Sequence, residues 1–96
     1  AHYIGAIRYV RLPDWVDEGY CDYVAKGTDF SYDKAVAALK HDEPEMHYER
    51  SGLYLRYHLR VAHLLDHREI SVARLFSTQF DPLEIDKEII EYAGRR

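Results

Sequence analysis

Cysteine is nearly absent from this sequence: Cys21 is the only one among 96 residues. An internal disulfide therefore cannot form, and neither a thiolate zinc site nor a CxxC redox pair can be built. The chain must fold without covalent cross-links, which is the ordinary situation in a reducing compartment.

The chain also lacks an excess of positive charge and a long apolar run. Its formal net charge is -4 at pH 7, whereas a free-standing nucleic-acid-binding domain usually carries a strongly basic surface. No apolar segment approaches the roughly 20 residues that a helix needs to cross a bilayer. We therefore predict neither a nucleic-acid partner nor a transmembrane helix.

The length predicts a single domain, residues 1–96, with a thin core, because a chain of this size buries only about 60–65% of its unfolded surface. We predict a mainly α fold: a small helical domain of three to four helices over residues 29–96, preceded by an irregular N-terminal arm over residues 1–28. Residues 1–12 fit either a helix or a strand. The acidic, glycine-containing segment 14–27 is typical of an irregular connection.

Helix-start patterns recur in residues 29–96. Asp29 or Ser31 can cap a short Ala-rich helix over DKAVAALK, residues 33–40. Three further segments place an Asp three residues before a Glu, which is the spacing of a capping box, and two of them include a Pro near the first turn. These three predicted helix starts are Asp42 to Glu45, Asp66 to Glu69 and Asp81 to Glu84.

The pattern of residues 53–61 is compatible with two secondary structures, a strand and a helix. The strict alternation of apolar and polar residues in LYLRYHLRV is typical of a half-buried strand. The apolar pattern, however, continues through Leu65 without a turn signal, and Leu, Arg and Ala favour a helix. We favour the helix.

The last segment, FDPLEIDKEIIEYAGRR, predicts a helix with Pro82 at its first position and Gly94 at its end. Its apolar stripe is Ile85, Ile89 and Tyr92, and its outer face is expected to be acidic through Glu84, Asp86, Glu88 and Glu91. With the preceding SVARLFSTQF it has the outline of a helix-turn-helix. Because phosphates would repel the acidic second helix, that motif is excluded.

Arginine, histidine and tyrosine gather in residues 48–69. On a helix, Arg56, Arg60, His63 and His67 lie at i, i+4, i+7 and i+11, so they form one stripe that must face an anion or water. A solvated face with intrahelical ion pairs, each about 0.3–0.5 kcal/mol, is one interpretation. We prefer a docking surface, since Arg with Tyr is typical of protein interfaces. The predicted interface residues are Tyr48, Arg50, Tyr54, Arg56, His58, Arg60 and His63.

No residue pattern indicates catalysis, a metal or a cofactor. The sequence shows no nucleophile beside a base, no close carboxylate pair and no phosphate-binding glycine loop. His63 and His67, with Asp66 nearby, share a helical face suited to zinc, but a third ligand at a defined spacing is missing. A nucleic-acid surface would have to use Arg56, Arg60, Arg68 and Arg74 with tyrosine stacking. We expect a protein that is not an enzyme and holds no cofactor.

Several segments of residues 29–96 resemble segments of one known protein family, and they follow one another in the same order. AVAALKHDEPE (35–45), with Pro44 and Glu45, resembles an Ala- and Leu-rich helix that leads to Leu-Pro-Glu. Tyr48, Arg50, Arg56 and His58 resemble an arginine-bearing helix; His63, Leu64 and Leu65 resemble its stop; and FDPLEIDKEI (80–89) resembles a final acidic helix. All belong to the ubiquinol-cytochrome c reductase binding protein family, the small helical subunit on the matrix side of the mitochondrial cytochrome b/c1 complex.

The resemblance implies a non-catalytic accessory and assembly subunit of the respiratory chain. Such a subunit holds neither haem nor quinone, lies peripherally on the matrix side of the mitochondrial inner membrane, and packs on cytochrome b and the core subunits. The alternative is a free-standing regulatory module that binds a partner protein as an inhibitor or adaptor. A nucleic-acid-binding protein is the least favoured alternative.

Overall fold

The computed structural model describes residues 14–47 and 51–94. These ranges hold five α-helices: α1 (Asp14–Lys26), α2 (Tyr32–Lys40), α4 (Leu55–Ala62), α5 (Val72–Ser77) and α6 (Pro82–Gly94). Short 3-10 turns occupy Gly27–Asp29 and Pro44–Met46, and α4 runs on into a π-helical segment over His63–His67. The mainly α fold is confirmed, as is the helix at residues 55–62, and no strand occurs in the described ranges.

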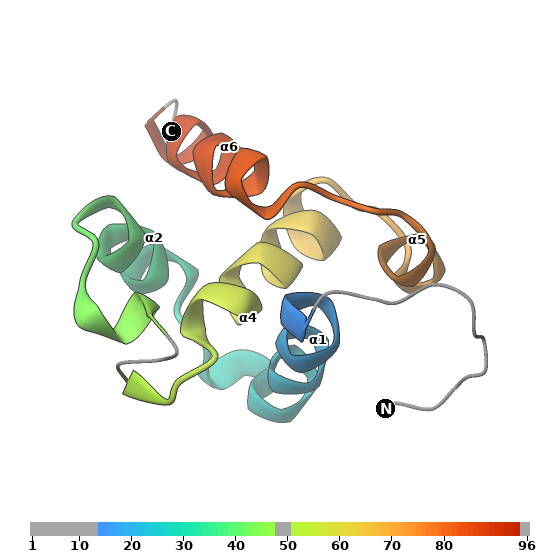
Figure 1. Ribbon diagram of the computed structural model, residues 1–96, viewed down its shortest axis with the longest axis horizontal. Coiled ribbons are helices and arrows are strands. Elements are labelled where there is room, and N and C mark those ends of the chain that lie inside the picture. Colours follow the sequence, from blue (N-terminus) through green and yellow to red (C-terminus); the bar gives the residue numbers. More distant parts are fainter. Residues whose placement is uncertain (1–13, 48–50, 95–96) are drawn as a thin grey trace.

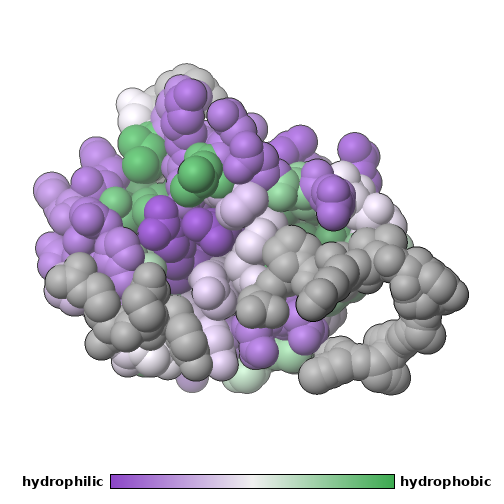
Figure 2. Space-filling view, in the orientation of Figure 1, coloured by the Kyte–Doolittle hydropathy of each residue, from purple (hydrophilic) through white to green (hydrophobic). Residues whose placement is uncertain are grey.

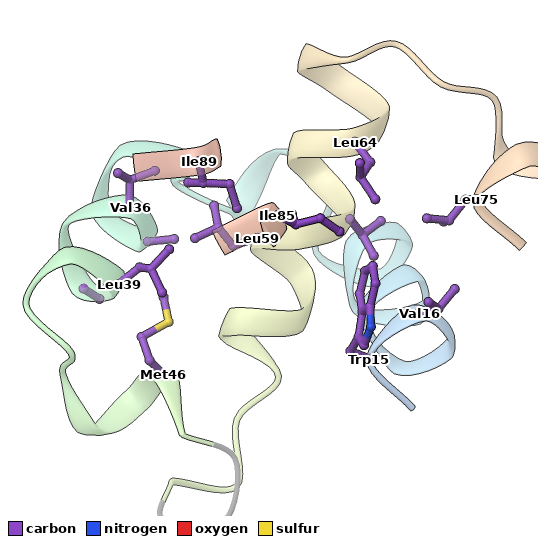
Figure 3. Close-up of a cluster of buried hydrophobic side chains, with 13 residues drawn as sticks. Trp15, Val16, Val36, Leu39, Met46, Leu59, Leu64, Leu75, Ile85 and Ile89 are labelled. Atoms are coloured by element: carbon purple, nitrogen blue, oxygen red, sulfur yellow. The ribbon is translucent and has the colours of Figure 1, made fainter. Parts of the chain in front are cut away.

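Helix α4 lies at the centre of the molecule, with α1, α2 and α6 around it and α5 at one end (Figure 1). Leu59 of α4 is fully buried on the side that faces Val36 and Leu39 of α2, whereas Trp15 of α1 lies on the other side of α4 (Figure 3). The apolar positions of α6, Ile85 and Ile89, close the core from above. One core thus joins α1, α2, α4 and α6, so none of these helices is an appendage.

The prediction of an irregular arm is wrong for residues 14–26, which form α1. Trp15 and Val16 are buried in the core, and Tyr20 and Tyr23 follow four and seven residues after Val16 on a face that packs against it. A salt bridge of 2.9 Å between Lys26 and Asp22, one turn apart, adds support within the helix. The glycine and the acidic residues of this segment favour a loop, but the spacing of its apolar residues is helical.

Gly19 explains why a glycine stands inside α1. A Cβ built at this residue would lie 2.6 Å from the carbonyl oxygen of Tyr57 and 2.8 Å from a methyl group of Val61, both on α4. Any side chain would therefore push α1 away from α4. The residue that weakened the helix prediction is the one that lets the two backbones touch.

Two of the predicted helix starts are correct. The hydroxyl oxygen of Ser31 accepts a hydrogen bond from the amide of Lys34, which makes Ser31, not Asp29, the cap of α2. The carboxylate of Asp81 accepts from the amide of Leu83 at 3.0 Å, at the start of α6.

The other two capping boxes do not start α-helices, and the first precedes only the 3-10 turn Pro44–Met46, which has no side-chain cap. Asp42 and Glu69 both have positive φ, 51° and 58°, which is the left-handed conformation that ends a helix. After α2, the amide of Glu43 donates to the oxygen of Ala38, so the segment from Asp42 is the end of a helix. After the π-helical segment, the amide of Ile70 similarly donates to the oxygen of Leu64. The next helix, α5, begins only after Ser71, whose hydroxyl accepts from the amide of Arg74.

Within residues 14–47 and 51–94, no helix combines the length and the apolar character needed to cross a lipid bilayer. Hydrophilic side chains predominate on the face shown in Figure 2, with hydrophobic patches over α6.

We predict that Gly19→Ala destabilises the domain by a net ~1–2 kcal/mol. The added methyl group overpacks the α1–α4 contact, and this cost exceeds the roughly 1 kcal/mol gained from the higher helix propensity of alanine. Urea denaturation followed by circular dichroism measures the difference. Gly94→Ala is the matched control, because a Cβ at Gly94 would meet nothing within 4 Å. Equal stability changes in the two variants would contradict the close approach.

Candidate functional site

The densest polar cluster of the described chain lies between α4 and α6. Arg56 and Arg60, one turn apart on α4, both bind the carboxylate of Asp86 on α6. Arg60 donates from Nε to Oδ1 at 2.7 Å and from Nη2 to Oδ2 at 2.9 Å, and Arg56 donates from Nε and Nη2 to Oδ2 at 3.0 and 2.8 Å. Four charge-assisted hydrogen bonds therefore converge on one carboxylate.

This cluster is largely removed from water. Arg60 and Asp86 are each only 7% exposed, while the side chain of Arg56 remains partly accessible. The guanidinium of Arg60 also lies 5.6 Å from the ring centre of Trp15, within the range of a cation–π contact. Arg60 thus connects all three helices α1, α4 and α6.

His63 extends the polar contact along the same face. Its Nε2 lies 2.9 Å from a carboxylate oxygen of Glu88 on α6, and its Nδ1 lies 3.2 Å from the hydroxyl of Tyr32 on α2. Because a carboxylate only accepts, Nε2 carries the proton and Nδ1 accepts from Tyr32 in the neutral ring. His63 is 2% exposed, and burial lowers its pKa despite the opposing effect of Glu88.

The π-helical segment places His67 beside His63. Nδ1 of His67 lies 3.1 Å from the hydroxyl of Tyr92, and the two imidazole rings are 6.0 Å apart. Single π-helical turns often occur at functional sites, since the wider turn re-aims side chains. Here the turn gives α6 a second aromatic contact, between His67 and Tyr92.

A second histidine cluster holds α1 to the opposite side of α4. Nδ1 of His58 donates to Asp22 at 2.9 Å, and Phe30 stacks on the imidazole ring with centroids 3.6 Å apart. His58 is 1% exposed; burial lowers its pKa, and the hydrogen bond to Asp22 offsets this only in part. For Asp22, burial alone would raise the pKa, but the hydrogen bonds from Lys26 and His58 lower it overall.

Tyr23 ties α1 to the π-helical segment. Its hydroxyl donates to the carboxylate of Asp66 at 2.6 Å, and this bond raises the pKa of Tyr23 to about 12.

The predicted docking surface is corrected by these contacts. His58, Arg60 and His63 are buried and bonded to carboxylates of α1 and α6, so they cannot meet a partner in this fold. Tyr54 stacks on Tyr57 with centroids 5.9 Å apart and stays partly exposed. Tyr48 and Arg50 lie outside the described residues. Arg56, Arg60 and His63 of the stripe do face anions, as predicted, but these are carboxylates of the chain's own α6. His67, the last residue of the stripe, contacts the hydroxyl of Tyr92.

The predicted acidic outer face of α6 is also only partly correct. Asp86 points inward to Arg60, and the carboxylate of Glu88 accepts a hydrogen bond from His63. Glu84 and Glu91 are exposed. The four arginines considered for nucleic acid do not form one surface, because Arg56 and Arg60 are turned toward Asp86.

The structure also does not place Asp66 with the two histidines considered for a zinc site. Asp66 points to Tyr23 rather than to His63 and His67. Among residues 14–47 and 51–94 no group of three His, Cys, Asp or Glu side chains is arranged to hold a metal ion.

Sequence reasoning missed the acceptors of this network: Asp22, Asp86 and Glu88. One signal was available for Asp86, which directly follows Ile85, the start of the buried stripe of α6. Two arginines one turn apart on a facing helix require such an inward carboxylate. No comparable signal in the sequence links His58 to Asp22, because 36 residues separate them.

Comparison with known proteins finds no matching family, no matching curated sequence and no matching solved structure.

We predict that Asp86→Asn destabilises the domain by about 3–5 kcal/mol, since it leaves the buried charge of Arg60 without a counter-ion. Thermal or urea denaturation measures this. Glu84→Gln, which removes one exposed carboxylate from the preceding turn of α6, should stay within about 0.5 kcal/mol of the parent. A cost below about 1 kcal/mol for Asp86→Asn would mean that the network does not hold the helices together.

We predict that stability falls as the pH falls below about 6.5, the ordinary pKa of histidine. His58 and His63 have lowered pKa values in the folded chain, so the unfolded chain takes up protons first on acidification. Each histidine then contributes a slope of up to about 1.4 kcal/mol per pH unit. Urea midpoints between about pH 7.5 and 5 measure the slope.

The variant His63→Gln should flatten this pH dependence, even if its stability is lower throughout. His41→Gln is the control, because His41 is exposed and its loss should leave the slope unchanged. A His63→Gln slope identical to that of the parent would show that this imidazole does not resist protonation.

Proposed function

We propose that this chain is a non-catalytic accessory subunit of a respiratory complex of the cytochrome b/c1 type, bound on the matrix side of the mitochondrial inner membrane. Its role is to pack on the membrane subunit and core subunits and to support their assembly. The proposal rests on the resemblance to the ubiquinol-cytochrome c reductase binding protein family, together with the order of the helices.

The order of helices is the observation that carries the proposal. The Ala-rich segment is α2, and Pro44 opens the turn after it. The described part of the arginine-bearing segment is α4, which ends at Ala62 and runs on into the π-helical segment that holds His63, Leu64 and Leu65. The acidic final segment is α6. The resemblance implies each of these elements, in the same order.

The polar network supports a scaffold role. Arginine and histidine side chains of α4 and of the π-helical segment are bonded to carboxylates of the same chain, which fixes the relative positions of α1, α4 and α6 without a ligand. Partners then meet the outer faces of these helices, where large apolar side chains are exposed. These are Val24 of α1, Leu53 before α4, Val72 of α5 and Leu83 of α6, between 43% and 67% exposed.

A free-standing regulatory module is the second candidate, favoured by one observation. The core of α1, α2, α4 and α6 is closed by the chain's own side chains, including a buried ion-pair network. Such a domain folds without a partner, as an inhibitor or adaptor must.

Isolation of the native protein from its source in mild detergent tests both candidates. Size fractionation, mass spectrometry and haem absorbance of the same fractions show what travels with it. For the accessory subunit we expect co-migration with cytochrome b and the core subunits at constant stoichiometry, surviving a second fractionation.

Migration near 11.3 kDa, or with soluble proteins only, would contradict the subunit proposal and favour the regulatory module. Leu83→Glu provides a matched check on the docking surface, because Leu83 is 67% exposed and its change leaves the core intact. Loss of co-migration in that variant, with unchanged helix content, would map the contact to α6.

A further inference from the structure

A groove runs along the outer side of α6. One part, of about 270 Å³, is lined by Arg68, Lys87 and side chains of residues 80–91. A second part, of about 180 Å³, continues from it past His67 and Tyr92, and the two share Arg68 and Glu88. Phe80 and Ile85 give the first part an apolar floor, and its walls carry Asp81, Glu84, Glu88 and Glu91.

We propose that this groove binds an arginine-bearing helix of a partner protein. The inference rests on the proposed docking function and deepens it, because it names the chemistry of the partner segment. The lining carries four carboxylates and two cationic side chains, so its net negative charge is complementary to a basic segment. The apolar floor accepts an aliphatic side chain that lies between the partner's arginines.

The carboxylates are spaced for such a partner. Glu84, Glu88 and Glu91 lie at i, i+4 and i+7, so their backbones are separated by about 6 Å and about 4.5 Å along the helix axis. Arginines four and three residues apart on a facing helix match this spacing. Glu84 and Glu91 are exposed and make no ion pair with the described residues, so they are open to an incoming guanidinium.

The chain already contains this mode of recognition twice. On the inner side of α6, Asp86 binds Arg56 and Arg60, one turn apart on α4. Within the groove itself, Arg68 lies 3.6 Å from Glu88. A guanidinium therefore fits both sides of α6, and an outer helix would repeat the contact that α4 makes on the inner side.

The test uses the full chain and a synthetic helical peptide of about 14 residues, with arginines four and three residues apart and leucines beside them. The control peptide carries glutamine in place of each arginine. Binding is followed by calorimetry at low and at physiological salt, and by the NMR shifts of the protein. We expect the arginine peptide to bind at least tenfold more tightly than the control, with weaker binding at higher salt and shifts centred on Phe80 and Ile85.

The double variant Glu84→Gln, Glu91→Gln should weaken binding of the arginine peptide at least tenfold. The matched control is Glu43→Gln, Glu45→Gln, which removes the same charge from exposed positions away from the groove and should leave the affinity unchanged. Circular dichroism checks that both variants keep their helix content.

Equal weakening in both double variants would overturn the proposal, because attraction would then follow net charge only. NMR shifts centred on other residues, or no binding of the arginine peptide at low salt, would also overturn the proposal. Sedimentation that shows a dimer competing with the peptide would assign the groove to a second copy. Binding that appears only in an Arg8→Gln, Arg11→Gln variant would assign it to the chain's own first residues. Co-migration with cytochrome b is measured separately, so either proposal can fail alone.

Discussion

The bonds of Asp86 with Arg56 and Arg60 are the constraint on which the domain depends. Breaking one partner of a buried ion pair is costly because the other charge stays behind without water. This one carboxylate accepts hydrogen bonds from two guanidiniums, and one of these also lies against Trp15. The positions of α1 and α6 on α4 are therefore linked through a single side chain, which suits a small domain whose apolar core is thin.

Two buried histidines add further contacts between α4 and its neighbouring helices, one on each side of α4. His58 faces Asp22 and Phe30, and His63 faces Glu88 and Tyr32. The neutral ring of His63 uses both nitrogens in hydrogen bonds, and that of His58 donates to Asp22 and stacks on Phe30. A neutral ring is buried at lower cost than a charged side chain. Phe30 of the connection between α1 and α2 contacts His58, and Tyr32, the first residue of α2, contacts His63, so the chain is held by a distant contact on each side of Ser31. At physiological pH the neutral histidines therefore help to hold the helices together, and their protonation in acid lowers the stability of the domain.

Local signals predicted much of the fold, and long-range pairing explains what they missed. Ser31 and Asp81 act through neighbours two or three residues away, so the starts of α2 and α6 could be predicted from the sequence. Gly19 acts through Tyr57, on another helix, so the sequence around Gly19 does not reveal this contact and predicts a loop in place of α1. The Asp-to-Glu spacings at residues 42 and 66 imitate helix starts because local spacing does not distinguish a helix start from a helix end that adopts positive φ. The arginine stripe correctly required an anion, but spacing could not reveal that α6 would provide it.

Trp15 gives the domain an optical consequence. It is the only tryptophan in the chain, it is 4% exposed, and its indole N–H finds no acceptor among the described residues. Its ring lies where α1 meets Arg60 of α4. The tryptophan fluorescence therefore reports on a single joint: its emission is set by a dry, cation-facing environment and changes when water reaches that joint, whether or not the remaining helices have opened.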